Sequence, residues 1–359
     1  MSNEDGLNNQ NEKGNSMETI RVGVVGAGAN TVTMHIPKLQ AIEGVEIVSV
    51  CNRSRASSER VAKQFGIPTI YETWTELIEA DDTDAIVVGT WPYLHCATSL
   101  AALANGKHIL CEARMAMNHE EALLMHDAAQ GNPDLVAQIV PSPMTLWADK
   151  TIQRLIAEGF VGDILSVELR SSGSDFIDRD GPMHWRQNTD YSGMNIMTMG
   201  IWYEAMRRWV GDPLSVFAQG KTFTRMRRDA DTGVMRAIRV PEHVDIVMDM
   251  ICGASAYIKI STVQGLANES EATIYGSEGT IRMGDSKLYG ARRGDDALSE
   301  IEIRPEDHGE WRVEEEFVNA IRGLEKVSHT PFDVGIKYME FTEAVNRSMA
   351  EGKAISLPL

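Results

Sequence analysis

From residue 20 onward, short runs of consecutive apolar residues alternate with segments in which apolar residues recur every three or four positions. Runs of the first kind are typical of strands buried on both faces, and segments of the second kind are typical of helices. The alternation predicts a doubly wound parallel sheet, the arrangement of a Rossmann-type domain. The predicted strands are 20–25, 45–50, 85–88, 108–111 and 135–140, and the predicted helices lie near 33–41, 57–65, 74–78, 97–104 and 119–130.

The pattern changes after Pro141 and Pro143, where one more helix at 150–158 is followed by strands in which polar and apolar residues alternate. Alternation of this kind predicts a largely antiparallel sheet with one face on helices and the other toward solvent or a second subunit. We therefore expect a homodimer or homotetramer formed through this sheet. Its predicted strands are 164–170, 216–224, 243–252, 256–263, 272–275 and 280–283, and two helices at 311–324 and 334–349 close the chain.

These patterns divide the chain into three parts. Residues 1–18 are polar and lack apolar periodicity, which predicts a disordered tail. Residues 19–142 form the predicted nucleotide-binding domain, and residues 143–359 form a second α/β domain for substrate binding and oligomerisation. We expect the two closing helices to pack back toward the first domain.

Composition excludes several classes of function. Hydrophobic residues make up 43% and charged residues 24%, as in globular proteins. A net charge of −18 opposes binding to nucleic acid. We find neither an apolar run long enough to span a membrane nor the pattern of a signal peptide, so we expect a cytoplasmic protein. The four cysteines and nine histidines are not grouped at metal-ligand spacings, so no metal site is predicted.

A glycine-rich turn follows the first predicted strand and precedes a helix. Gly26 permits a tight turn, and Gly28 lets the backbone approach a pyrophosphate that rests at the helix N-terminus. Ala29 and Asn30 continue the turn, which has room for one extra residue compared with the usual spacing. The context predicts a dinucleotide-binding site rather than a structural turn alone.

The end of the second predicted strand bears on the choice of cofactor. It reads Asn52-Arg53-Ser54, with a guanidinium and no carboxylate. A carboxylate at this point usually binds the ribose of NAD, whereas an arginine favours the 2′-phosphate of NADP. We therefore expect NADP in preference to NAD, with Asn52 and Ser54 as further hydrogen-bonding groups. The alternative is that Arg53 is simply a solvated loop residue.

Recognisable motifs occur along most of the chain, in segments 22–28, 91–95, 106–112, 185–186, 208–213, 332–335 and 355–358. Together they resemble the motifs of the glucose-fructose oxidoreductase, inositol dehydrogenase and MocA (Gfo/Idh/MocA) family. The resemblance implies a Rossmann domain, a second domain with a large open sheet, a nicotinamide cofactor, and hydride transfer to or from a sugar or polyol. It also places Trp91, Pro92, His95 and Glu112 beside the cofactor.

The chain departs from the family pattern at the residues that usually carry the chemistry. Where the family has Glu-Lys-Pro, this chain reads Glu112-Ala113-Arg114. Where the family has Asp-x-Gly-x-His, it begins with Thr198 and ends with Trp202. Ala113, Thr198 and Trp202 thus stand where the family has lysine, aspartate and histidine. None of these three side chains accepts a proton at neutral pH, so the family's proton transfer does not carry over.

Other residues in the expected cleft are candidates for the missing roles. His184, Tyr191, Tyr203 and Arg114 are candidates for proton transfer or charge stabilisation. The structural alternative stays open for each, because a lone histidine or tyrosine more often serves as a hydrogen-bonding core residue. Predicted substrate contacts are Arg114, Trp185, Arg186, Thr198 and Trp202.

Three functions fit these observations. The first is an NAD(P)-dependent oxidoreductase acting on a small hydroxyl or carbonyl compound. The second is a lyase or glycoside-cleaving enzyme that uses the nicotinamide without net oxidation. The third is a cofactor-binding pseudoenzyme or redox sensor, suggested by the replacements at positions 113, 198 and 202.

Overall fold

The computed structural model describes residues 19–359, so the tail predicted for residues 1–18 lies outside the described part. The first sheet has six parallel strands in the order β3-β2-β1-β4-β5-β6. This order confirms the predicted doubly wound Rossmann sheet. Its strands are β1 (Ile20–Val25), β2 (Val45–Cys51), β3 (Thr69–Ile70), β4 (Ala85–Val88), β5 (His108–Cys111) and β6 (Ala137–Ile139).

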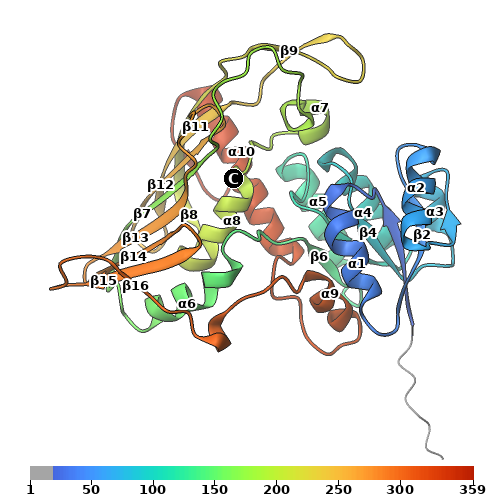
Figure 1. Ribbon diagram of the computed structural model, residues 1–359, viewed down its shortest axis with the longest axis horizontal. Coiled ribbons are helices and arrows are strands. Elements are labelled where there is room, and N and C mark those ends of the chain that lie inside the picture. Colours follow the sequence, from blue (N-terminus) through green and yellow to red (C-terminus); the bar gives the residue numbers. More distant parts are fainter. Residues whose placement is uncertain (1–18) are drawn as a thin grey trace, which may run out of the picture.

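Helices lie around this sheet (Figure 1). They are α1 (Ile36–Gln40), α2 (Arg55–Phe65), α3 (Trp74–Glu79), α4 (His95–Ala104) and α5 (His119–Gln130). The strand order changes direction between β1 and β4, and ligands of open α/β sheets bind beyond the strand ends at such a point. The glycine-rich turn and the segments after β2, β4 and β5 all lie at this edge.

The helix after the glycine-rich turn differs from the prediction. It contains a π-helical turn, Thr31–His35, before α1 begins. A π-turn accommodates an extra residue in a helix, and such turns are frequent at functional sites. The buried side of this turn carries Thr31 and His35.

The second sheet has nine strands in the order β16-β15-β14-β13-β7-β12-β11-β8-β17. Within this second sheet, β7–β12 is the only parallel pair among the described strands, which confirms a mostly antiparallel sheet. The strands are β7 (Ile164–Ser172), β8 (Pro213–Lys221), β11 (His243–Met250), β12 (Ser255–Ser261), β13 (Ser270–Gly276), β14 (Gly279–Gly284), β15 (Lys287–Arg292), β16 (Ser299–Glu300) and β17 (Ile355–Ser356).

Helices cover one face of the second sheet, and a separate hairpin extends from one end of it. The helices include α6 (Leu146–Ala157), α8 (Met199–Val210) and α10 (Phe332–Glu351), and Figure 1 shows α8 and α10 between the sheet and the first domain. Strands β9 (Met226–Arg228) and β10 (Met235–Ala237) form the hairpin, and a short helix α7 (Thr189–Ser192) lies below it. No helix within residues 19–359 is both long and apolar enough to cross a membrane.

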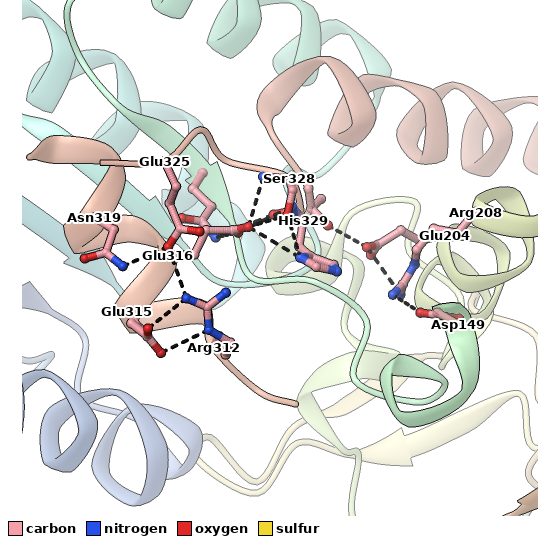
Figure 2. A network of polar contacts seen from close by, with 12 residues as sticks. Asp149, Glu204, Arg208, Arg312, Glu315, Glu316, Asn319, Glu325, Ser328 and His329 are labelled. Carbon is pink, nitrogen blue, oxygen red and sulfur yellow. Dashed lines mark hydrogen bonds and ion pairs between the residues drawn. The ribbon is translucent and has the colours of Figure 1, made fainter. Parts of the chain in front are cut away.

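The C-terminal segment joins the two sheets. Helix α9 (Val313–Ile321) packs Val313, Phe317 and Val318 into the same apolar cluster as strands β1 and β2. Polar contacts, drawn in Figure 2, also hold this C-terminal segment to the rest of the chain. Glu316 accepts hydrogen bonds from Gln138 and Ser328, and the buried Glu204 of α8 accepts one from Thr330 Oγ1.

The same junction holds α8 against the linker between the sheets. Glu204 also accepts the backbone N–H of Ser142 at 3.1 Å, and Arg208 donates to Asp149 of α6 at 2.5 Å. Buried carboxylates need such partners because an unpaired charge is costly away from water. The network fixes the axis of α8, whose N-terminus faces the site described below.

Candidate active site

The glycine-rich turn has the geometry of a pyrophosphate site. Gly26 has φ +83°, and a Cβ added there would lie 2.4 Å from Thr90 Cγ2 and 2.8 Å from Thr90 N. A Cβ on Gly28 would lie 3.2 Å from the Gly89 carbonyl oxygen. No side chain of the described residues caps the start of the π-turn, and a helix start of this kind attracts anions. These residues therefore fit a dinucleotide phosphate group.

Of the three residues after β2, Asn52 and Ser54 have structural roles, whereas Arg53 is exposed. Asn52 Oδ1 accepts the N–H of Ala27 at 2.6 Å, and its amide nitrogen donates to Ser57. Asn52 thus holds the glycine-rich turn in place, a supporting role that the sequence did not predict. Ser54 is the N-cap of α2. Arg53 is exposed and donates to Asp231, at the tip of the β9–β10 hairpin, at 3.2 Å.

A buried charge network lies behind the end of β5. The His35 ring is fully buried, with Nδ1 at 2.6 Å from Glu314 Oε1 and Nε2 at 3.0 Å from Glu112 Oε1. Burial acts to lower the pKa of His35, but the hydrogen bonds with Glu112 and Glu314 outweigh it and raise the pKa to about 9. His35 is therefore a cation at neutral pH that links α9 to the site.

Glu112 is held as a carboxylate by this network. Burial acts to raise its pKa, but His35, the amide of Asn30 and the N–H of Ala113 together lower the pKa below the usual value. Asn30 belongs to the glycine-rich turn, so Glu112 ties that turn to the end of β5. A fixed carboxylate beside the expected nicotinamide position suits orientation rather than proton transfer.

Aromatic side chains from the two domains meet across the site. Trp91, after β4, stacks on Trp185 with ring centroids 5.3 Å apart and planes inclined by 11°. Tyr191 packs against Trp91 at 4.8 Å and against Tyr93 at 5.5 Å. Pro92 is buried at the start of the short 3₁₀ turn after Trp91. The predicted cofactor segment 91–92 and the predicted substrate segment 184–191 are thus brought together.

Two arginines, Arg114 and Arg186, lie near the aromatic contact between Trp91 and Trp185. Arg114 is only 4% exposed, and its guanidinium has no hydrogen-bond or ion-pair partner among residues 19–359. Burial, with Arg186 acting in the same direction, lowers the pKa of Arg114 to about 10. Arg186 lies over the Trp185 ring at 4.3 Å, and burial lowers its pKa as well.

The first turn of α8 adjoins Arg114. A Cβ on Gly200 would lie 3.1 Å from Arg114 Cδ, so only glycine allows this approach without displacing the arginine. Thr198 is the N-cap of α8, but its hydroxyl does not cap the helix and lies 3.4 Å from Ser171 Oγ. The amides of this helix start, the Thr198 hydroxyl and Arg114 therefore share one region.

His184 and Tyr191 are polar groups available at the site. His184 Nδ1 accepts the N–H of Arg186 at 3.2 Å, which places the proton of the neutral ring on Nε2. Burial and Arg186 lower the pKa of His184, so the ring is neutral at pH 7. Tyr191 is half-buried, and its hydroxyl has no partner within residues 19–359. The Nε2–H of His184 and the hydroxyl of Tyr191 can each donate a hydrogen bond.

Three predicted site residues are placed elsewhere. The His95 ring is fully buried, with its nitrogens 2.9 Å from the Arg114 carbonyl and 3.0 Å from the Thr90 carbonyl, so both ring nitrogens are used to support two loops. Trp202 is 2% exposed in the core and does not line the cleft. Tyr203 stacks on Phe341 at 3.8 Å, and burial raises its pKa well above the usual value, which excludes it as a base.

The sequence prediction missed three residues that shape the site. His35 and Glu314 lie 279 positions apart, and Asp231 lies 178 positions from Arg53, so no local pattern connects them. For His35 the only local signal was a single histidine near the start of the first helix, and such a histidine is most often a core residue. The unusual spacing after Gly28 was the one feature that pointed to the π-turn carrying His35.

The chain resembles known oxidoreductases in sequence. It is 26% identical over 197 residues to D-xylose 1-dehydrogenase (NADP(+)) 2 of Haloferax volcanii, covering 55% of this chain and 59% of that protein. It is 27% identical over 192 residues to glucose-6-phosphate 3-dehydrogenase of Bacillus subtilis, covering 51% and 53%. The match thus spans little more than half the length of these two relatives.

The fold resembles that of levoglucosan dehydrogenase, solved in complex with NADH and L-sorbose. The TM-score is 0.83 at 21% identity, covering 95% of this chain and 99% of the other. Two family models also match: an oxidoreductase family with an NAD-binding Rossmann fold over residues 20–138, and the GFO/IDH/MocA C-terminal domain over residues 150–282. The chain belongs to the Gfo/Idh/MocA family of oxidoreductases.

Proposed function

We propose that this protein is an NAD(P)-dependent oxidoreductase that transfers a hydride between the nicotinamide and a sugar, a polyol or a related compound. The observation that carries the proposal is the glycine-rich turn at the switch point of the first sheet, which leads into a helix start without a side-chain cap and is linked through Asn30 and Glu112 to the end of β5. When bound, the nicotinamide supplies or accepts the hydride. The sugar and polyol dehydrogenases among the relatives support the substrate class.

The residues of this chain divide the remaining work. Glu112, fixed by His35, orients the bound ring, and the aromatic contact of Trp91 with Trp185 excludes water from the site. The Nε2–H of His184 and the hydroxyl of Tyr191 donate hydrogen bonds to the substrate oxygen. Because each group carries a hydrogen that it can donate, the two suit stabilisation of a carbonyl oxygen as it is reduced.

A turnover screen tests this proposal. Purified protein is mixed with NADPH or NADH and keto sugars, or with NADP⁺ or NAD⁺ and sugars or polyols, and the absorbance of the reduced nicotinamide is followed. We expect turnover with at least one compound, reduced at least tenfold by Tyr191→Phe or His184→Ala. A cofactor that copurifies and cycles without net change would favour the lyase or glycoside-cleaving alternative. Binding without any turnover would favour the pseudoenzyme.

For the cofactor, we propose NADP in preference to NAD. Arg53 is the only charged side chain in the 52–54 segment, and the Asp231 contact is an exposed ion pair that a 2′-phosphate can displace at little cost. We expect Arg53→Asp to weaken NADPH binding about 10- to 100-fold and NADH binding by less than about 3-fold, since charged hydrogen bonds contribute roughly 1.5–3 kcal/mol. Asp231→Asn should tighten NADPH binding, because it frees Arg53. Equal losses of both cofactors in Arg53→Asp would remove the argument for the 2′-phosphate.

We also propose a homodimer or homotetramer formed through the open face of the second sheet. Phe217 and Val247 are paired across β8 and β11, and both side chains remain exposed in the single chain. Exposed apolar side chains grouped on a sheet face mark association surfaces. Light scattering on purified protein should give a mass of two or four chains, and a monomer at micromolar concentration would refute the proposal.

A further inference from the structure

Arg114 stands out because its guanidinium is buried, and Glu112, whose charge attracts it, does not form an ion pair with it. Its guanidinium has no ion-pair or hydrogen-bond partner within residues 19–359, and its Nε is unpaired. A buried, unpaired cation is costly, and proteins keep one only where something pairs with it. The nearby Glu112 does not fill this role, because its oxygens are engaged by His35, Asn30 and the Ala113 N–H.

A second cation and a helix start face the same region. Arg186 also lacks an ion-pair partner within the described residues, and it is close enough to help lower the pKa of Arg114. The first turn of the 12-residue helix α8 touches Arg114 through Gly200 and has no side-chain cap. Helix N-termini attract anions through free amides and the helix dipole. Position 198 is threonine, so it brings no carboxylate to oppose an anion there.

We infer that the substrate is an acidic sugar or polyol derivative, whose carboxylate or phosphate is held by Arg114 and Arg186 at the N-terminus of α8. The planar guanidinium of Arg114 offers two parallel donors to an oxyanion. This inference rests on the proposed oxidoreductase function, and it adds the charge of the substrate. It also gives a reason for the exchange of the family's usual lysine and aspartate for Ala113 and Thr198, with an added guanidinium beside them.

The cofactor's own phosphates are not the expected partners of Arg114. The glycine-rich turn after β1 and Arg53 after β2 provide the phosphate sites at one part of the sheet edge. Arg114 follows β5, two strands from β1, next to Glu112 and α8. An anion on Arg114 therefore lies at the nicotinamide and substrate end.

Calorimetric titration of the NADPH-saturated protein, or of the NADH complex if that cofactor binds more tightly, tests the inference. The probes are D-glucuronate for a carboxylate, D-glucose 6-phosphate for a phosphate, and neutral D-glucose. We expect at least one acidic probe to bind ten or more times as tightly as D-glucose. In Arg114→Gln this difference in affinity should disappear. Arg114→Lys keeps the positive charge but loses the two parallel donors of the guanidinium, so it should retain part of the difference.

Arg304→Gln is the matched control, because Arg304 is an exposed arginine with no ion pair among the described residues, and it should keep the full preference. Cofactor affinity, measured in every variant, reports correct folding. If neither acid binds more tightly than D-glucose, or if Arg114→Gln keeps the preference, the inference is wrong. If no cofactor binds to the wild-type protein, the proposed function itself fails, so the two failures are distinguishable.

Discussion

Replacing His35 by leucine is expected to lower the free energy of unfolding by about 4 kcal/mol, because it leaves Glu112 and Glu314 buried and close together without the cation between them. Removing one partner of a buried ion pair typically costs roughly 3–5 kcal/mol. Urea unfolding at pH 6.5 measures the loss. The control is His308→Leu, at an exposed histidine, which should change stability by less than about 0.5 kcal/mol.

The pH dependence of this loss identifies its cause. The pKa of His35 is raised to about 9 in the folded protein, from roughly 6.5 in the unfolded chain. Its contribution to stability is therefore fully present below pH ~6.5 and is lost as pH rises through about 9. The stability difference between wild type and His35→Leu should narrow over that range. A difference that stays constant from pH 6.5 to 9.5 would mean that the ring acts only by packing.

Replacing Gly26 by alanine is expected to abolish nicotinamide binding and to destabilise the fold by about 3 kcal/mol. The new Cβ would meet the backbone nitrogen of Thr90 at 2.8 Å, and φ is +83°. Strain of each kind costs on the order of 1–3 kcal/mol. Moving the turn to relieve the clash would also displace the amides that face the pyrophosphate. Nicotinamide fluorescence should show no saturable binding of NADPH at micromolar concentration.

Gly66→Ala separates the strain of a positive φ from the strain of a steric clash, which occur together in Gly26→Ala. Gly66 ends α2 with φ +69°, but a Cβ there meets nothing within 4 Å. We expect a loss of about 1 kcal/mol and unchanged NADPH affinity. Equal NADPH affinity in Gly26→Ala and wild type would show that the turn does not bind the cofactor.

The first domain was predictable because each element is local and strongly patterned. Strands such as β4 consist entirely of buried apolar residues, and the glycine-rich turn has a fixed relation to the strand before it. The prediction missed five short strands, β3, β9, β10, β16 and β17, and also the six-residue strand β15. The five short strands hold only two or three residues each, too few for alternation to be recognised.

The site was less predictable, because burial and partners are set by tertiary packing. Trp202 and Tyr203 occupy a segment that usually faces the substrate, yet both turn into the core around Phe341 and α10. Arg114 was a candidate from its position alone, but only the structure shows that its guanidinium is buried without a partner. The Glu112–His35–Glu314 network joins three distant segments and leaves no local signature.

Titration of the wild-type protein with NADPH and with NADH, followed by nicotinamide fluorescence, tests the central claim most directly. The account predicts saturable binding of at least one of them at micromolar concentration, lost in Gly26→Ala and kept in Gly66→Ala. An absence of binding to the folded wild-type protein would contradict the assignment of this site to a nicotinamide-dependent reaction.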